Sequence, residues 1–409
     1  MNVYQFETNI PEEEFDAFVK KSRYCNLLQS YHWANVKENW DHLYTGIYDE
    51  NRKLVATGLV LIKHLPAKFT MFYLPRGPIL DFENTRLLEF YFSELKQIAK
   101  KRHCLFIKVD PGITYADYHY EEKEDVTAYP KAKAIIAELE KIGGKYKGLN
   151  KDFHTTVQPR YHMTCHKEEF DSKNFTKKGK KNIKIAQKSF LEVRIGQEEL
   201  LDDFAKIMNK TEERKGIALR DKAYYQLLLE QYGKDCFITL GYFNIKKAYQ
   251  ETLERYQKCL SDLENCPENA KKKRFTLEEL KTSLERKKTE YKEELEASGD
   301  EVCVCGTCTV IYGPTSEILY AGMDETYKRL MAPYLVWYET MQHCFDCGCE
   351  MSNMGGIEGE LVGGLSDFKK IYNPVIHEFI GEFDIPVNKL LFKASEKAYQ
   401  IRKNKNNHE

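Results

Sequence analysis

Lysines gather in one short segment of this chain. Between residues 173 and 188 the sequence holds seven lysines and no acidic residue. Ammonium groups at this density attract phosphates strongly when no carboxylate neutralises them. The segment therefore predicts a polyanion-binding surface, and the alternative is an ordinary solvated helix face. Its central members are Lys177, Lys178, Lys180, Lys181 and Lys184.

Two other cations stand one helical turn from an aromatic ring. Lys37 follows Trp33 by four residues, and Tyr224 follows Arg220 by four. Residues four apart share one face of a helix, so each cation is able to hold a phosphate over a ring. The alternative is that each long side chain only covers apolar surface.

A further cation, Lys369, follows a loop that is bracketed by glycine pairs at 355–356 and 363–364. No Gly-Lys-Ser/Thr sequence follows the glycines, so the loop is not a phosphate loop of the Walker type. We expect Lys369 to lie at the mouth of the second half of the chain.

Motifs for covalent catalysis are absent from the sequence. It contains no Gly-x-Ser-x-Gly and no His-Glu-x-x-His, and no cysteine has a histidine partner by motif. Cations without a nucleophile suit direct group transfer, in which positioning and charge stabilisation supply most of the rate.

Six of the twelve cysteines lie in two short groups. CxxC pairs about 35 residues apart can form a zinc site, but alternation with valine favours a buried strand in which cysteine acts as a small apolar residue. The six are Cys303, Cys305, Cys308, Cys344, Cys347 and Cys349.

Length and charge narrow the class of protein. The 409 residues suffice for two or three domains, and 42% hydrophobic residues indicate a globular chain. With 62 basic and 63 acidic residues the net charge is −1, so any attraction to nucleic acid must be local. We expect no signal peptide and no spanning helix, reduced thiols and a cytoplasmic protein.

The elements that must position these residues occur in the same order twice. Each half reads as helices, an antiparallel meander, a long helix and a final strand, which predicts two copies of one α+β unit. In the first half we expect strands at 42–48, 53–63 and 68–74, a helix at 84–102 and a strand at 104–109. In the second half we expect helices at 179–189, 197–213 and 221–231, strands at 236–243, 301–312 and 317–322, a helix at 325–346 and a strand at 349–355.

An insertion at 246–299 separates the first two meander strands of the second copy. Tyr249, Leu253, Tyr256, Leu260 and Leu263 step by four and three residues, which is the rhythm of a coiled coil. The pattern resumes after Pro267, so we expect a projecting helical hairpin with arms roughly 30 Å long. It handles a ligand, serves oligomerisation or is a decoration of the fold.

Six segments in order resemble the FemABX aminoacyltransferases, over about residues 5 to 400. The inserted hairpin resembles the arm of the FemA and MurM branch, which the shorter FemX type lacks. The segments are Gln29-Ser30-Tyr31-His32-Trp33 with Lys37, 74–81 (LPRGPILD), 214–220 (RKGIALR), 318–322 (ILYAG), 364–369 (GLSDFK) and 379–384 (FIGEFD).

The resemblance implies a fold and an activity. The expected fold is α+β, with two tandem acyl-CoA N-acyltransferase (GNAT)-like domains facing a cleft, at 1–150 and 151–390, and a C-terminal helix and tail at 391–409. The expected activity forms a peptide bond from an aminoacyl-tRNA ester to the side-chain amine of the third stem-peptide residue of a peptidoglycan precursor. That precursor is lipid II or UDP-MurNAc-pentapeptide, and lipid II would place the protein at the inner membrane surface.

The resemblance also implies site residues. Lys37 and Arg220 would hold the precursor's diphosphate, and Tyr224 and Tyr320 would line its site. Lys369 would stand by the ester carbonyl and stabilise the oxyanion, and Asp110 is a candidate base. The lysines from Lys177 to Lys184 would meet tRNA phosphates, although Lys180 and Lys181 stand where relatives carry an arginine and so lack its bidentate geometry.

No cofactor is expected besides the aminoacyl-tRNA co-substrate, and no metal is assigned. Two alternatives stay open. One is a CoA-dependent N-acyltransferase, although the segment closest to a pyrophosphate loop, Glu213 to Ala218, begins with a carboxylate. The other is a non-catalytic tRNA-binding or coiled-coil interaction protein.

Overall fold

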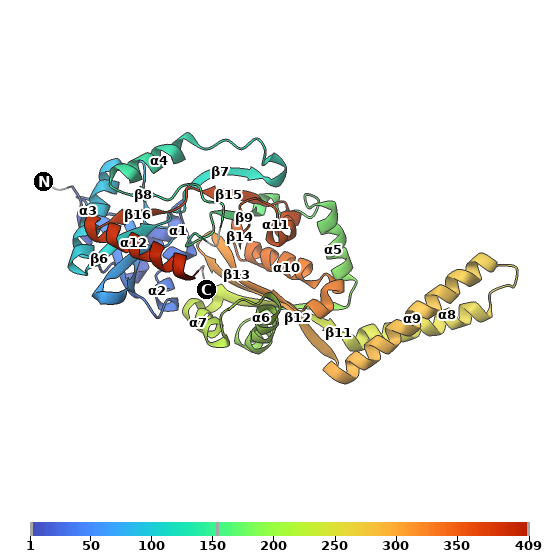
Figure 1. Ribbon diagram of the computed structural model, residues 1–409. Helices are drawn as coiled ribbons and strands as arrows, with labels where there is room; N and C mark the ends of the chain where they lie inside the picture. Colours follow the sequence, from blue (N-terminus) through green and yellow to red (C-terminus); the bar gives the residue numbers. More distant parts are fainter. Residues whose placement is uncertain (1–2, 153–154, 407–409) are drawn as a thin grey trace.

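A computed structural model describes residues 3–152 and 155–406 and contains two mixed eight-stranded sheets (Figure 1). The first sheet has the order β1-β2-β3-β4-β6-β16-β8, with β5 on β3. Its strands are β1 (Gln5–Glu7), β2 (Asp41–Tyr48), β3 (Leu54–His64), β4 (Thr70–Leu74), β5 (Ile79–Leu80), β6 (Cys104–Val109), β8 (Lys145–Tyr146) and β16 (Phe383–Pro386).

The second sheet has the order β10-β11-β12-β13-β14-β9-β15-β7. Its strands are β7 (Thr114–His119), β9 (Tyr161–His166), β10 (Leu191–Gly196), β11 (Cys236–Asn244), β12 (Glu301–Tyr312), β13 (Thr315–Met323), β14 (Met351–Gly356) and β15 (Val375–Phe379).

Both sheets contain the same supersecondary unit, as the sequence predicts. Strands β2-β3-β4 form an antiparallel meander, and the helix α3 (Thr85–Lys101) leads to β6, which pairs with β4 in parallel. Strands β11-β12-β13 form the second meander, and α10 (Ala332–Asp346) leads to β14, which pairs with β13 in parallel. A helical crossover is what a parallel pair requires.

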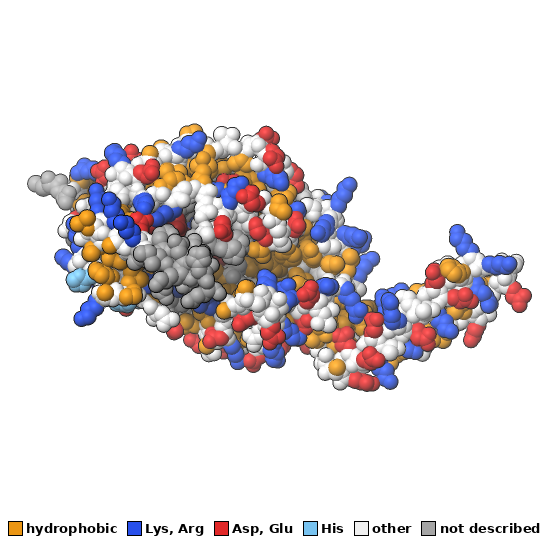
Figure 2. Space-filling model, in the orientation of Figure 1, with side chains coloured by type: hydrophobic (Ala, Val, Ile, Leu, Met, Phe, Trp, Pro, Cys, Tyr) orange, Lys and Arg blue, Asp and Glu red, His pale blue; other side chains and the backbone are white. Residues whose placement is uncertain are grey.

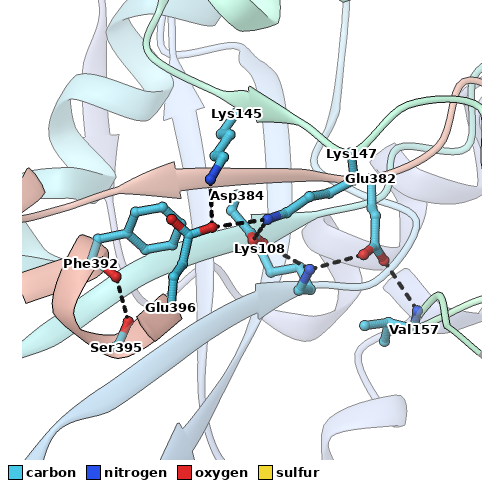
Figure 3. Close-up of polar contacts among 9 residues, drawn as sticks. All are labelled: Lys108, Lys145, Lys147, Val157, Glu382, Asp384, Phe392, Ser395 and Glu396. Carbon is cyan, nitrogen blue, oxygen red and sulfur yellow. Dashed lines mark hydrogen bonds and ion pairs between the residues drawn. The ribbon is translucent and has the colours of Figure 1, made fainter. Parts of the chain in front are cut away.

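Each half also gives one strand to the sheet of the other half. β16 lies between β6 and β8 in the first sheet, and β7 pairs with β15 in the second. Buried charges fix β16 there (Figure 3): Lys108 Nζ lies 2.7 Å from Asp384 and 3.1 Å from Glu382, and Lys147 Nζ lies 2.6 Å from Asp384. The predicted domain boundary near residue 150 remains a prediction. Strands from each side of this position belong to the sheet of the other side.

The remaining helices flank these sheets. They are α1 (Glu12–Lys21), α2 (Trp33–Val36), α4 (Pro130–Lys141), α5 (Lys177–Gln187), α6 (Leu201–Lys215), α7 (Lys222–Tyr232), α11 (Gly364–Lys369) and α12 (Lys389–Asn406). The α12 helix crosses the first sheet, where Glu396 lies 2.6 Å from Lys145 (Figures 1 and 3). No helix in the described ranges has both the length and the apolarity needed to span a membrane.

One predicted helix begins later than expected. The segment from 325 to 346 divides at Met331, whose φ is +55° and which ends a short 3-10 helix, Glu325–Leu330. Met331 leaves helical geometry, and Pro333, whose missing amide hydrogen is not needed in the first turn, fits the start of a new helix. The long helix α10 therefore starts at Ala332.

The insertion forms the predicted hairpin of two helices, α8 (Ile245–Glu264) and α9 (Lys271–Ser298), which projects from the globule in Figure 1. Its seam buries Cys259 and Leu284. At the root, Asn244 of β11 pairs with Glu301 of β12, and the Lys246 amide donates to the Asp300 carbonyl at 3.2 Å. The hairpin therefore leaves and re-enters the sheet at adjacent points.

A hydrophobic core joins the two halves. Phe15, Leu28 and Trp33 from the first half pack with Tyr225 and Val310 from the second. Polar contacts cross the same junction, since Asn35 donates to Gln231 at 2.6 Å and the hydroxyl groups of Ser30 and Tyr232 lie 2.7 Å apart. The helices α2 and α7 consequently lie together, and with them the ends that carry Lys37 and Arg220.

Candidate active site

Lys37 and Arg220 come from different halves of the chain and lie near each other. Lys37 follows α2 with its Nζ 5.0 Å from the Trp33 ring centroid, and Arg220 precedes α7 with its guanidinium 4.8 Å from the Tyr224 ring centroid. Burial, and then the charge of Arg220, lower the pKa of Lys37. Neither cation has an ion pair with any residue in the described part of the chain. Two neighbouring cations without a carboxylate form a site for an anion.

Tyrosines form the wall beside this pair. The ring of Tyr320 lies 5.8 Å from that of Tyr224 and 5.3 Å from that of Tyr225, both in edge-to-face geometry. Burial raises the pKa of Tyr320, and the charge of Arg220 opposes this rise. Four of the predicted residues, Lys37, Arg220, Tyr224 and Tyr320, therefore gather at one place.

Lys369 is held at the end of the short helix α11. Glu358 in the glycine-bracketed loop accepts hydrogen bonds from the Leu365 amide at 3.1 Å and the Ser366 amide at 2.9 Å, and so caps this helix. Lys369 is 5% exposed and donates from Nζ to the Gly356 carbonyl at 2.9 Å. Burial lowers the pKa of Lys369 to about 7.

Asp110 lies directly after β6 and binds Arg76, which follows β4. The Arg76 amide donates to Asp110 Oδ1 at 3.0 Å, and the guanidinium Nη1 lies 3.8 Å from Oδ2. Burial raises the pKa of Asp110 to about 6, although Arg76 opposes this shift. The carboxylate thus holds a buried arginine at the end of the first parallel pair of strands.

Arg76 extends from the first half to the second. Its Nη2 donates to the Pro159 carbonyl at 2.6 Å and to Nε2 of His162 at 3.1 Å, and its guanidinium lies 4.2 Å from the Phe379 ring centroid. Burial, Arg76 and Lys369 all lower the pKa of His162, which keeps this imidazole neutral. Asp110 therefore contacts Arg76, Arg76 contacts His162, and the charge of Lys369 acts on His162.

Glu317 is a member of this cluster that sequence reasoning misses. It lies on β13, and burial raises its pKa to about 7 while Arg76 and Lys369 oppose the rise. Nothing in the local sequence marks it, because it stands in an ordinary strand far from the glycine-bracketed loop. The buried cluster thus comprises Arg76, Asp110, His162 and Lys369, with the half-buried Glu317 at its side.

The five predicted tRNA-binding lysines all lie on the exposed face of α5, where blue side chains gather in Figure 2. The opposite face, with Ile183 and Ala186, packs into the core. The Thr176 amide at the start of α5 donates to the Ile371 carbonyl at 3.0 Å, two residues after Lys369. The lysine face is therefore anchored beside the element that carries Lys369, although its lysines do not join the buried cluster.

The six cysteines do not form a common site. Cys308 belongs to the core between the two halves, Cys305 to the core at the root of the hairpin, and Cys344 to the core behind the second sheet. Across the residues that the structure describes, no three histidine, cysteine or acidic side chains are placed to hold a metal ion. Cys303, Cys305 and Cys308 lie in the strand β12 as expected, with Cys303 half-buried, whereas Cys344 lies on α10 and Cys347 is exposed.

Comparison with known proteins adds a family and a fold. The model of the FemAB family matches residues 10–400. Aminoacyltransferase FemA of Staphylococcus aureus, strain MRSA252, is 29% identical over 408 residues, covering 95% of this chain and 96% of that protein.

Solved structures confirm the expected fold. The crystal structure of FemX has a TM-score of 0.75 at 22% identity and covers 95% of this chain and 99% of that one. A tandem GNAT protein from the clavulanic acid biosynthesis pathway has a TM-score of 0.50 at 6% identity, covering 94% and 99% of the two chains.

Proposed function

Because the chain belongs to the FemAB family, we propose that it transfers an amino acid from an aminoacyl-tRNA to the side-chain amine of the third stem-peptide residue of a peptidoglycan precursor. The membership confirms the expected family and the expected enzyme class, an acyltransferase. One observation carries the finer proposal: two unpaired cations and a tyrosine wall lie at the junction of the two halves, next to a buried cluster that contains Lys369.

The acceptor occupies the Lys37 and Arg220 side in this proposal. Both cations can bind the negative charge of a diphosphate. Each cation also lies over an aromatic ring, Lys37 over Trp33 and Arg220 over Tyr224. Both lipid II and UDP-MurNAc-pentapeptide contain this diphosphate. With lipid II the enzyme would work as a peripheral protein at the inner membrane surface, and with the soluble precursor it would work in the cytoplasm.

The donor occupies the Lys369 side. A tRNA ester is already activated, so an uncharged amine attacks its carbonyl once it is held about 3 to 3.5 Å away. The ammonium of Lys369 is able to stabilise the oxyanion that forms, and its burial strengthens that interaction. The lysine face of α5 supports a tRNA backbone that reaches Lys369, because nucleic acid is bound largely through its phosphates.

A transfer assay tests the proposal. The purified protein is incubated with charged tRNA or with acetyl-CoA, each with lipid II and with UDP-MurNAc-pentapeptide, and the precursor is weighed by mass spectrometry. We expect the mass of one amino acid to be added from charged tRNA alone. Transfer from acetyl-CoA alone, or from neither donor, contradicts the proposal and favours the CoA-dependent or the non-catalytic alternative.

A further inference from the structure

A β-bulge turns Glu317 toward the junction of the two halves. Along β12 and β13, Cys308 pairs with Tyr320, Thr309 with Ile318, and Val310 with Glu317, so Leu319 is the extra residue. Directly paired residues share a face, and Cys308 and Val310 both face the core between the halves. Glu317 and Tyr320 therefore lie on the same face, although their numbers differ by three. Bulges re-aim side chains in this way beside active sites.

The second sheet is also interrupted beside Glu317. Pairing between β13 and β14 extends only from Thr315 to Glu317, while β13 continues to Met323. The side chain of Lys369 lies beside β14 just past this point. A Cβ atom added to Gly355 would lie 3.7 Å from Lys369 Nζ and 3.8 Å from the Ile318 carbonyl oxygen, so both atoms are close to Gly355. The ammonium of Lys369 therefore lies close to the backbone next to Glu317, where the two strands stop pairing, and its charge acts on Glu317.

The carboxylate of Glu317 has no hydrogen bond or ion pair with any residue at positions 3–152 or 155–406. Glu317 is half-buried, and carboxylates that are partly withdrawn from water are normally satisfied by donors or cations. Asp110 and Asp384 in the same protein follow this rule, since each has a cation or an amide donor. Glu317 differs from Asp110 and Asp384 because no donor or cation among the described residues contacts its carboxylate. The carboxylate is therefore available to a substrate group.

We propose that Glu317 receives the ammonium of the acceptor side chain and accepts its proton before the amine attacks the ester. This inference rests on the proposed function. The primary amine of the acceptor arrives protonated at neutral pH, and a carboxylate without a partner both attracts such a group and takes its proton. Glu317 then lies between the predicted diphosphate site, through Tyr320, and the predicted oxyanion site, through Lys369.

One ammonium proton passes to Glu317, and the nitrogen lone pair forms the C–N bond to the ester carbonyl, whose oxygen becomes an oxyanion beside Lys369. The C–O bond to the ribose then breaks, and the leaving ribose oxygen takes a second proton from the same nitrogen. Glu317 returns its proton to solvent, so the products are an amide, a free ribose hydroxyl and one proton.

Asp110 is less suited to this task than sequence reasoning expects. Its Oδ1 already accepts the Arg76 amide, and its charge is shared with the Arg76 guanidinium. His162 is occupied as well, because Nε2 accepts from Arg76 and Nδ1 contacts the Asn353 amide. Glu317 is the titratable group of the buried cluster whose polar atoms are free of such contacts among the described residues.

The test compares two nucleophiles with Glu317→Gln and with a matched control, Glu339→Gln. Glu339 is another half-buried carboxylate with a raised pKa, but it lies on α10 outside the cluster. We expect Glu317→Gln to lower transfer from charged tRNA to the precursor by about 10²- to 10⁴-fold, the usual contribution of a general base. Transfer to hydroxylamine, which is uncharged at neutral pH, should fall less than about tenfold, and Glu339→Gln should leave both rates unchanged.

The pH profile supplies a second readout. Burial raises the pKa of Glu317, and the charges of Arg76 and Lys369 oppose this rise. Burial lowers the pKa of Lys369, the charges of Glu358 and Glu317 oppose this shift, and the charge of Lys215 adds to it. The wild-type rate should rise with pH up to about 7 as Glu317 ionises, and Glu317→Gln should lose this rise, whereas Glu317→Asp should keep it at a lower rate. An unchanged rate for a folded Glu317→Gln, or an equal loss with both nucleophiles, overturns the inference. A wild-type protein that transfers nothing from charged tRNA instead overturns the proposed function.

Discussion

Lys369 carries its charge at a cost to stability. Its pKa is about 7 in the folded protein but near 10.5 when the chain is unfolded. Below pH 7 both states are protonated and the folded state bears the full penalty of a buried cation. Between about pH 7 and 10.5 the unfolded state binds the extra proton, so this penalty fades as the pH rises.

Lys369→Met should therefore stabilise the protein while abolishing transfer. We expect the free energy of unfolding at pH 6 to increase by about 2 to 4 kcal/mol and the gain to shrink toward pH 10. Urea unfolding of both proteins across this pH range measures the difference. A gain that is equal at pH 6 and pH 10 would show that packing, and not charge, causes it.

Loss of the charge of Lys37 or Arg220 should lower the affinity for the precursor. Lys37→Met and Arg220→Gln each remove one charged contact to a diphosphate, worth about 1.5 to 3 kcal/mol, or roughly 10- to 100-fold in Kd. Lys222→Met is the control, because Lys222 starts the same helix α7 but pairs with Asp202. Calorimetric titration with UDP-MurNAc-pentapeptide gives the three Kd values. If both site variants bind like the control, the two cations serve packing alone.

The sequence predicts the cations of the site and Asp110, but not the other members of the cluster. Lys37 and Arg220 stand one turn from aromatic residues, and Lys369 follows the glycine-bracketed loop. Arg76 lies in the LPRGPILD segment, which gives no sign of its contacts with the second half, and Glu317 stands in an ordinary strand whose bulge shifts the pairing by one residue. Register shifts of this kind follow from tertiary packing and leave no local pattern.

At the scale of elements, the hairpin is inserted between two adjacent strands, and its root packs into the core. Asn244 and Glu301 are paired neighbours in β11 and β12, so the strands would continue as an ordinary hairpin without residues 245–300. The base of α9 does contribute packing, since the Tyr291 ring lies 5.8 Å from that of Phe243.

Replacing residues 245–300 with Asn-Gly should leave a folded protein. This dipeptide favours the tight turn that antiparallel neighbours need. We expect a single cooperative thermal transition, lowered by the loss of Ile245, Ala248 and Tyr291 from the core at the root of the hairpin, and unchanged affinity for UDP-MurNAc-pentapeptide. Calorimetry and the same titration measure both. A shortened protein that no longer binds the soluble precursor would place part of its site on the hairpin.

Elements of the two repeated units are predicted well, and strands outside these units are not. The helices α3 and α7 and the strands β3 and β12 lie within one or two residues of the expected bounds, because each has a strong apolar period. The strands β15 and β16 have five and four residues and escape detection. Without them the sequence does not reveal that the halves exchange strands.

At the scale of the whole molecule, Lys108 secures the exchanged strand β16. Its ammonium lies between Asp384 and Glu382, and all three side chains are at most 12% exposed. Although burial opposes the charge, Asp384 and Glu382 raise the pKa of Lys108. Lys108→Met leaves two buried carboxylates with fewer partners.

We expect this variant to lose about 3 kcal/mol of stability, because removing one member of a buried ion pair leaves uncompensated charge. The matched control is Lys141→Met, whose partner Glu138 lies on the exposed face of α4, and it should lose less than about 1 kcal/mol. Chemical unfolding measures the free energy of unfolding of both variants. Equal losses would show that the Lys108 ion pairs do not hold β16 in the first sheet.

The exchanged strands also bear on how the protein is made. Ribosomes release a chain from its amino terminus, and domains commonly fold in that order. Here the first sheet has a gap between β6 and β8 until residues 383–386 have been synthesised. The first sheet is therefore completed only after residues 383–386 have been synthesised, and until then the nascent chain exposes the unpaired edges of β6 and β8.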